Sequence, residues 1–161
     1  MQGITLIVDD EPLARMRMRS MLEPYASEFE VVGEAGSGEE AVQKIREESP
    51  DVVFLDIQMP DMNAFDVLQK INEDEMPLIV FTTAYENFAL RAFEENTVDY
   101  LLKPIEEERL ANTVEKLRKR LVSLDSESQI PLDFSWDKFR SMIDPSGFFL
   151  QRFQFKIGDR I

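Results

Sequence analysis

Short, mostly apolar runs alternate with amphipathic segments along the first three quarters of the chain. The runs are typical of buried strands, and they cover residues 4–8, 30–35, 52–55, 78–81 and 98–102. A strand that is apolar at consecutive positions is covered on both of its faces, which is the usual environment of a parallel sheet. The pattern therefore predicts a doubly wound α/β fold, with helices on both faces of a five-stranded parallel sheet.

A helix is predicted after each strand. The first begins at Pro12, which suits a first helical turn because the N–H it lacks would be unpaired there. A turn is predicted at residues 36–38, the second helix stops at Ser49-Pro50, and the last helix runs over residues 106–124. A further helix is predicted around residues 88–94. The positions expected to mark the apolar faces of the other helices are Leu13, Met16, Met21 and Leu22; Ala41, Val42 and Ile45; Phe65, Val67, Leu68 and Ile71; and Leu110, Val114, Leu117 and Leu121.

The amino-acid composition limits the kinds of catalytic and metal-binding site that this chain can form. The 161 residues include neither cysteine nor histidine, which excludes disulfides, thiolate zinc sites and catalysis by imidazole. Any metal must then be a hard ion bound by oxygen, such as magnesium or calcium. The net charge of −14 makes the chain as a whole a poor ligand for DNA. Neither a signal peptide nor a membrane-spanning run is evident, so we expect a cytoplasmic protein that does not bind membranes.

Polar side chains lie where the predicted strands end. Asp9 and Asp10 follow the first strand, Asp56 ends the third, Thr83 follows the fourth and Lys103 follows the fifth. In an open parallel sheet, ligands bind at the carboxyl ends of the strands, where the strand order reverses. If the order is 2-1-3-4-5, the first and third strands are neighbours, and the three aspartates converge on one site.

That convergence predicts phosphoryl chemistry. Three adjacent carboxylates repel one another unless a cation neutralises them, and Mg²⁺ prefers such oxygen ligands. Lys103 can pair with a phosphoryl oxygen, and Thr83 can donate a hydrogen bond to another. Asp56 is then placed to attack phosphorus and form an aspartyl phosphate. Taken singly, each residue also fits a helix cap, a turn or a solvated surface position; the combination carries the prediction.

Four motifs resemble those of the receiver domain of two-component response regulators. They are Leu6–Pro12, Phe54–Pro60, Thr83-Ala84 and Lys103-Pro104, and the resemblance covers residues 3 to about 122. It implies a flavodoxin-like fold with strand order 2-1-3-4-5.

The resemblance also implies a role for each site residue. Asp56 matches the phosphoacceptor. Asp10, Asp56 and the backbone carbonyl of Gln58 match the ligands of Mg²⁺, and Asp9 matches the acidic residue that assists through water. Thr83 and Tyr100 match the switch pair, and Lys103 matches the lysine that senses the phosphoryl group.

Two local backbone expectations follow from the same resemblance. The Lys103-Pro104 peptide bond should be cis. Ala64 stands where the family usually has glycine; if that position needs a positive φ, alanine costs about 1 kcal/mol and the loop bends slightly.

Further segments resemble the subgroup whose output is a LytTR-type DNA-binding domain. They include residues 12–15, 83–86, 89–93 and 98–105, and residues 151–161 are similar to the opening strand of that output domain. This predicts a receiver domain at 1–124, a linker at 125–147 and the start of a truncated DNA-binding domain at 148–161.

The implied partners are a sensor histidine kinase and a second copy of the chain. The two copies would meet through the face formed by the fourth helix, the fifth strand and the fifth helix, and DNA would bind only through the missing output domain. The protein would not be an enzyme, although it would assist its own phosphorylation and dephosphorylation.

Two alternatives remain. One is a receiver that works alone through protein contacts. The other is a phosphatase with an aspartyl intermediate; Gln58 argues against it, because such enzymes typically carry a second acid two residues after the nucleophile.

Overall fold

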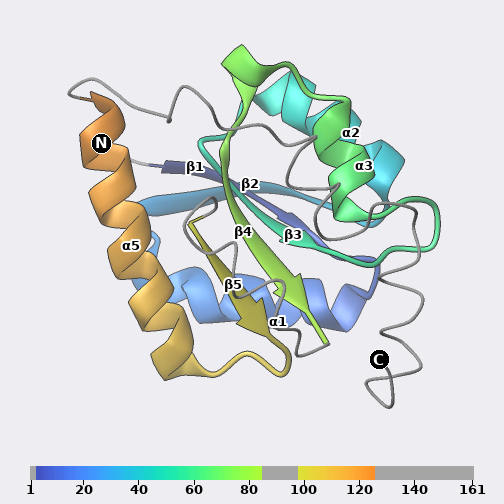
Figure 1. Ribbon diagram of the computed structural model, residues 1–161. Coiled ribbons are helices and arrows are strands. Elements are labelled where there is room, and N and C mark those ends of the chain that lie inside the picture. Colours follow the sequence, from blue (N-terminus) through green and yellow to red (C-terminus); the bar gives the residue numbers. More distant parts are fainter. Residues whose placement is uncertain (1–2, 85–97, 126–161) are drawn as a thin grey trace, which may run out of the picture. The chain divides into compact units, whose positions relative to one another are not determined.

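The computed structural model describes residues 3–84 and 98–125. One sheet contains five strands in the order β2-β1-β3-β4-β5, which confirms the predicted flavodoxin-like fold (Figure 1). The strands are β1 (Gly3–Val8), β2 (Phe29–Ala35), β3 (Val52–Asp56), β4 (Leu78–Thr83) and β5 (Asp99–Leu102). The helix predicted over residues 88–94, the linker from residue 126 on and the strand-like tail lie outside the described residues.

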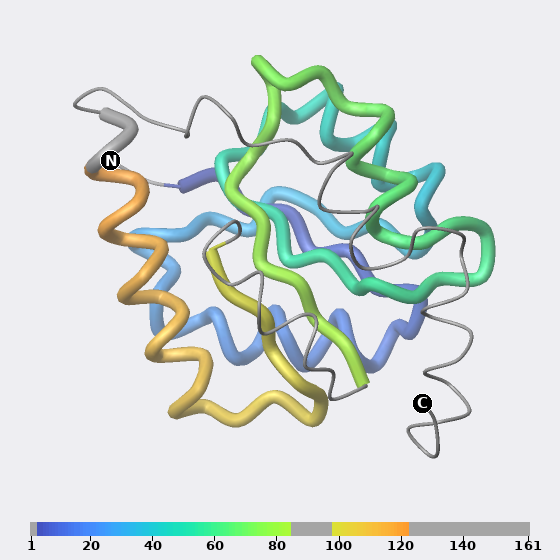
Figure 2. Tube along the Cα trace, viewed as in Figure 1, coloured from blue at the N-terminus to red at the C-terminus, as the bar shows by residue number. Residues whose placement is uncertain are grey.

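The chain divides into two compact units, Met1–Thr82 and Thr83–Ile161. In the first unit, β1 pairs in parallel with both β2 and β3, and β3 pairs in parallel with β4. Every residue of β3 is buried, as expected for a central strand that is apolar throughout. The register places Val8 opposite Leu55, so β1 and β3 end side by side (Figure 2).

Three α-helices complete the first unit: α1 (Pro12–Leu22), α2 (Gly38–Glu48) and α3 (Ala64–Gln69). Two short 3₁₀ segments, η1 (Glu23–Tyr25) and η2 (Glu73–Glu75), follow α1 and α3. Helices α2 and α3 pack together on one face of the sheet, and α1 lies on the other face (Figure 1). The covered strands thus obtain apolar partners on both sides, as predicted.

The buried face of α1 agrees only in part with the predicted one, in which Leu22 is buried as expected and Met21 is half-buried. Met18 and Leu22 are buried, whereas Leu13 is 75% exposed and Met16 is 62% exposed. Apolar residues occur on more than one side of this helix, so spacing alone did not define its inner face. The contacts of α1 with β1 and β2 decide which side is covered.

Local signals set the ends of the next two helices. Residues 36–38 are not simply a turn: Ser37 is the N-cap of α2, and its hydroxyl accepts a hydrogen bond from the Glu40 N–H at 3.1 Å. At the other end Ser49 adopts a left-handed conformation with φ of 47° before Pro50, as a helix stop requires. Helix α3 ends at Gln69, so Ile71 is buried just beyond the helix rather than within it.

The second unit contributes β5 and α5 (Glu107–Asp125). Leu110, Val114 and Leu117 are buried, which confirms most of the predicted apolar face, while Leu121 is only half-buried. Within the parts of the chain that the structure describes, no helix combines the length and the apolar character that a membrane span needs.

Candidate functional site

The three predicted aspartates meet in the first unit. Asp9 and Asp10 directly follow β1, and Asp56 is the last residue of β3, the neighbouring strand. One carboxylate oxygen from each residue lies within 4.8 Å of the others. Asp9 and Asp56 are each only 5% exposed, and Asp10 is half-buried. The structure therefore brings together the acidic group that the sequence predicted.

Backbone and side-chain contacts hold Asp9 in place. Its N–H donates to the Ala35 carbonyl at 3.0 Å, which continues the β1–β2 pairing by one residue. Its carboxylate accepts the Glu11 N–H at 3.0 Å, at the point where the chain turns into α1. Arg15 donates from Nη1 to the Asp9 carbonyl oxygen at 2.6 Å. The aspartate thus sits on a backbone that is fixed from two sides.

Arg15 is a site residue that the sequence reasoning missed. Its Nε also donates to Glu34 on β2 at 3.1 Å, and Arg19 donates to the other oxygen of Glu34 at 2.7 Å. The Arg19 hydrogen bond, helped by Arg15 and opposed by partial burial, lowers the pKa of Glu34 below its ordinary value. The spacing of the two arginines, four residues apart on a helix, was a usable signal for one shared acidic partner.

The donor set of the aspartate group fits a hard divalent cation. Three carboxylates this close are electrostatically unfavourable without a compensating charge, the more so because two of them are buried. All the donors are oxygens, which suits Mg²⁺ and excludes soft thiophilic metals. The residues present therefore fit the magnesium ion that the sequence predicted.

The loop after β3 is closed by backbone hydrogen bonds. The Ile57 N–H donates to the Thr82 carbonyl at 3.0 Å, and the Ile57 carbonyl accepts the Ala64 N–H at 2.9 Å. Gln58, whose carbonyl is the expected metal ligand, lies half-buried inside this loop.

Ala64 does not strain the loop. It is the first residue of α3 and is fully buried, and among the described residues other than glycine only Ser49 has a positive φ. The condition for the expected cost, a positive φ at residue 64, is therefore not met. A helical first-turn residue does not need the left-handed conformation that favours glycine.

Two further predicted residues meet in the second unit. The Lys103 N–H donates to the Thr83 carbonyl at 2.7 Å, which joins the ends of their two segments. Thr83 is 2% exposed, Lys103 is half-buried and Tyr100 is 8% exposed. The Lys103-Pro104 bond is cis, as predicted.

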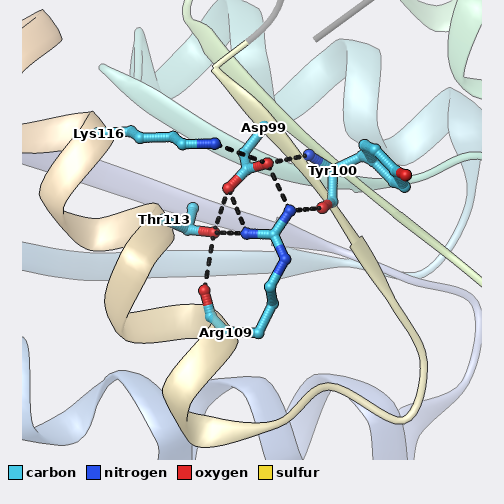
Figure 3. A network of polar contacts seen from close by, with 5 residues as sticks. All are labelled: Asp99, Tyr100, Arg109, Thr113 and Lys116. Carbon is cyan, nitrogen blue, oxygen red and sulfur yellow. Dashed lines mark hydrogen bonds and ion pairs between the residues drawn. The ribbon is translucent and has the colours of Figure 1, made fainter. Parts of the chain in front are cut away.

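A buried carboxylate between β5 and α5 was not anticipated. Asp99 is fully buried, and Arg109 donates to both of its oxygens, at 2.6 and 2.7 Å (Figure 3). The Thr113 hydroxyl donates to it at 2.7 Å, and Lys116 Nζ lies 3.4 Å away. Burial raises the pKa of Asp99, but the hydrogen bonds from Arg109 and Thr113 and the two positive charges outweigh it, so the pKa is lowered overall.

The same network holds the backbone of Tyr100. Its N–H donates to Asp99 Oδ1 at 2.9 Å, and its carbonyl accepts from Arg109 Nη2 at 2.9 Å (Figure 3). Both polar groups of this residue are thereby tied to side chains of β5 and α5. The network fixes the position from which the Tyr100 side chain extends.

One family model matches the chain: the response regulator receiver domain, over residues 5–115. That range includes every residue of the aspartate group, Thr83, Tyr100 and Lys103.

Curated relatives share the same region. The transcriptional regulatory protein BtsR of Salmonella typhi is 46% identical over 133 residues, which cover 80% of this chain and 55% of that protein. An uncharacterized response regulatory protein of Vibrio cholerae is 45% identical over 115 residues, covering 71% of this chain and 48% of that protein. The chain thus spans about half the length of these relatives.

Solved structures agree with the fold. The receiver domain of AraT, a response regulator from Geobacillus stearothermophilus, matches with a TM-score of 0.68 and 32% identity, over 79% of this chain and all of that one. The response regulatory domain of mrkE from Klebsiella pneumoniae matches with a TM-score of 0.61 and 32% identity, over 73% and 96% of the two chains.

Proposed function

Because this chain belongs to the response regulator receiver domain family, we propose that Asp56 accepts a phosphoryl group from a sensor histidine kinase. The observation that carries this proposal is the group of three aspartate carboxylates within 4.8 Å at the ends of β1 and β3. Asp56 is its member at the end of the central strand β3, where its backbone pairs with Thr82 of β4. A nucleophile gains from such fixation, because correct placement lowers the entropy cost of reaching the transition state.

In the proposed reaction, a carboxylate oxygen of Asp56 forms a bond to phosphorus while the bond between phosphorus and the donor breaks. Asp10, Asp56 and the Gln58 carbonyl would hold Mg²⁺, with Asp9 assisting through water. The bound ion would supply neutralisation of the charge on the phosphoryl oxygens. Lys103 would pair with one of those oxygens, and Thr83 would donate a hydrogen bond to another.

The proposed consequence is a switch in the second unit. Thr83 would move toward the phosphoryl group, and Tyr100 would turn inward into the space vacated. The surface made by the helix predicted over residues 88–94, β5 and α5 would then change and support a homodimer.

We further propose that the switch controls DNA binding by a LytTR-type output domain. Support comes from the motifs of the subgroup and from relatives about twice as long that are named transcriptional regulatory proteins. Sequencing the parent gene beyond Ile161 tests this extension. A coding sequence for such a domain is expected, and a stop codon at that point would refute it.

The phosphoacceptor role is tested with acetyl phosphate and Mg²⁺, followed by intact-protein mass spectrometry. The unmodified chain is expected to gain one phosphoryl group, and Asp56→Ala should not. Asp51→Asn is the matched control, because the Asp51 carboxylate accepts the Ile4 N–H at 2.8 Å just before β3, at the strand end opposite to Asp56. Labelling that persists in Asp56→Ala would contradict the assignment.

The two alternatives give different results in simple assays. A phosphatase would turn over small phosphate esters repeatedly, whereas an acceptor stops after one phosphoryl group per chain. A receiver that works alone would be encoded without a DNA-binding domain.

A further inference from the structure

The loop that follows Asp56 is attached to the start of α2 by one carboxylate. Asp61 lies five residues after Asp56, and its two oxygens accept the backbone N–H groups of Gly38 and Glu39 at 2.9 and 3.0 Å. The Gly38 hydrogen bond is the main reason that the pKa of Asp61 is lowered. The Glu39 hydrogen bond adds to it, although the slight desolvation of this exposed carboxylate opposes both. The negative charge also faces the positive end of the helix macrodipole.

The cap of α2 is shared between Asp61 and residues next to the helix start in sequence. Ser37 already provides the N-cap by accepting the Glu40 N–H, and the Glu40 side chain accepts the Gly36 N–H at 2.9 Å. Helix α2 therefore has its own capping residues within residues 36–40. The contact from Asp61, which comes from a segment 23 residues away, joins the loop to the helix end by accepting the N–H groups of its first two residues.

A close approach of the backbone reinforces the attachment. A Cβ atom on residue 38 would overlap the side chain of Met62, which would then have to shift. The loop is fixed at its beginning as well, by the hydrogen bond from Ile57 to Thr82. Gln58 lies between these two anchored points.

We propose that Asp61 is a positioning residue for the magnesium site, and this inference rests on the proposed function. By holding the loop to α2, Asp61 limits the conformations open to Gln58, whose carbonyl is the proposed metal ligand, before the ion arrives. Without the Asp61 contact, the loop becomes ordered only when Mg²⁺ binds. The entropy cost of that ordering lowers the affinity for the ion. Outer contacts that orient metal ligands typically contribute about 10- to 100-fold to affinity.

The experiment measures the Mg²⁺ dissociation constant of the full chain by isothermal titration calorimetry. Asp61→Ala is expected to raise it about tenfold, the lower end of that range, since Asp61 acts through the loop. Asp61→Asn keeps one acceptor oxygen on a side chain of the same shape. Its Mg²⁺ dissociation constant should lie between those of the parent chain and Asp61→Ala. Gly38→Ala perturbs the same contact from the helix side and should also weaken binding.

Ser37→Ala is the matched control. It removes a hydrogen bond from the same helix end without touching the loop, so the chain should lose stability while its Mg²⁺ affinity stays unchanged. A thermal midpoint measured for each variant separates stability from affinity. If Asp61→Ala does not fold, the nearly isosteric Asp61→Asn decides the comparison.

The possible results separate the inference from the function on which it rests. Unchanged affinity in the Asp61 variants, with normal binding by the parent chain, overturns the positioning role. Equal weakening by Ser37→Ala also overturns it, because the effect would then come from the helix end. Absence of Mg²⁺ binding by the parent chain refutes the proposed magnesium site itself.

Discussion

Replacing Arg109 by methionine tests whether the buried network between β5 and α5 stabilises the fold. The guanidinium is the main partner of Asp99, a carboxylate with no exposed surface, and it also donates a hydrogen bond to the Tyr100 carbonyl (Figure 3). Methionine keeps much of the length and apolar volume of the side chain but removes its charge and all its donors. The substitution leaves a buried negative charge with only part of its compensation.

The expected loss of unfolding free energy is about 3 kcal/mol. Removing one partner of a buried ion pair costs about 3–5 kcal/mol, because an uncompensated charge remains. The lower end applies here, since 36% of the Arg109 side chain is exposed and both Thr113 and Lys116 still face Asp99. Arg118→Met on the same helix should cost only about 0.2–0.5 kcal/mol, because Arg118 pairs with Glu115 at the surface.

Urea denaturation followed by circular dichroism provides the assay, at several pH values between 7 and 3. The pKa of folded Asp99 is lowered from its ordinary 3.8, so the stabilisation is complete above that value and is lost as the pH falls through the folded-state pKa. The difference between the parent chain and Arg109→Met should therefore shrink at acid pH. Adding Asp99→Asn to Arg109→Met should recover part of the lost unfolding free energy, because it removes the uncompensated charge of the buried carboxylate.

Two results would refute the reasoning. One is a loss in Arg109→Met no larger than that in Arg118→Met. The other is a loss that stays constant across the pH range, since it would show that the pairing with ionised Asp99 is not its source.

Two other predictions concern the aspartate group and the inner face of α1. Without Mg²⁺, Asp56→Asn should raise the unfolding free energy by roughly 1–3 kcal/mol at low salt, because it removes one of three neighbouring charges. Mg²⁺ at 100 times its dissociation constant should stabilise the parent chain by about 2.7 kcal/mol and should stabilise Asp56→Asn much less. Thermal denaturation measures both effects, and equal stabilisation of the two chains would mean that the ion binds elsewhere. In α1, Leu22→Ala should cost about 2–5 kcal/mol and Leu13→Ser within about 0.5 kcal/mol, because Leu22 is buried and Leu13 is exposed. Equal losses in urea denaturation would contradict the observed face.

The strands and the aspartate group could be predicted from the sequence for a clear physical reason. A central parallel strand is covered on both faces, so its apolar character is continuous and visible along the chain, as in Val52–Leu55. The residue after such a run lies at the sheet edge where ligands bind. Asp9, Asp10 and Asp56 were therefore recognisable before their positions were known.

Contacts between segments distant in sequence could not be predicted in the same way. Only tertiary packing decides that Asp61 meets the start of α2, that Arg15 reaches the Asp9 carbonyl and that Arg109 covers Asp99. Each contact depends on which turn of a helix faces which loop or strand, and hydrophobic periodicity does not specify polar partners. The inner face of α1 was undetermined for the same reason, since several of its sides carry apolar residues.

The sequence by itself thus determined the fold class and the candidate phosphoryl chemistry, because both depend on the order of strands and on the residues at their ends. The tertiary structure decided how that chemistry is supported. Polar side chains such as Asp61 and Asp99 form specific hydrogen bonds only after the helices have docked, and docking is set by packing over the whole sheet.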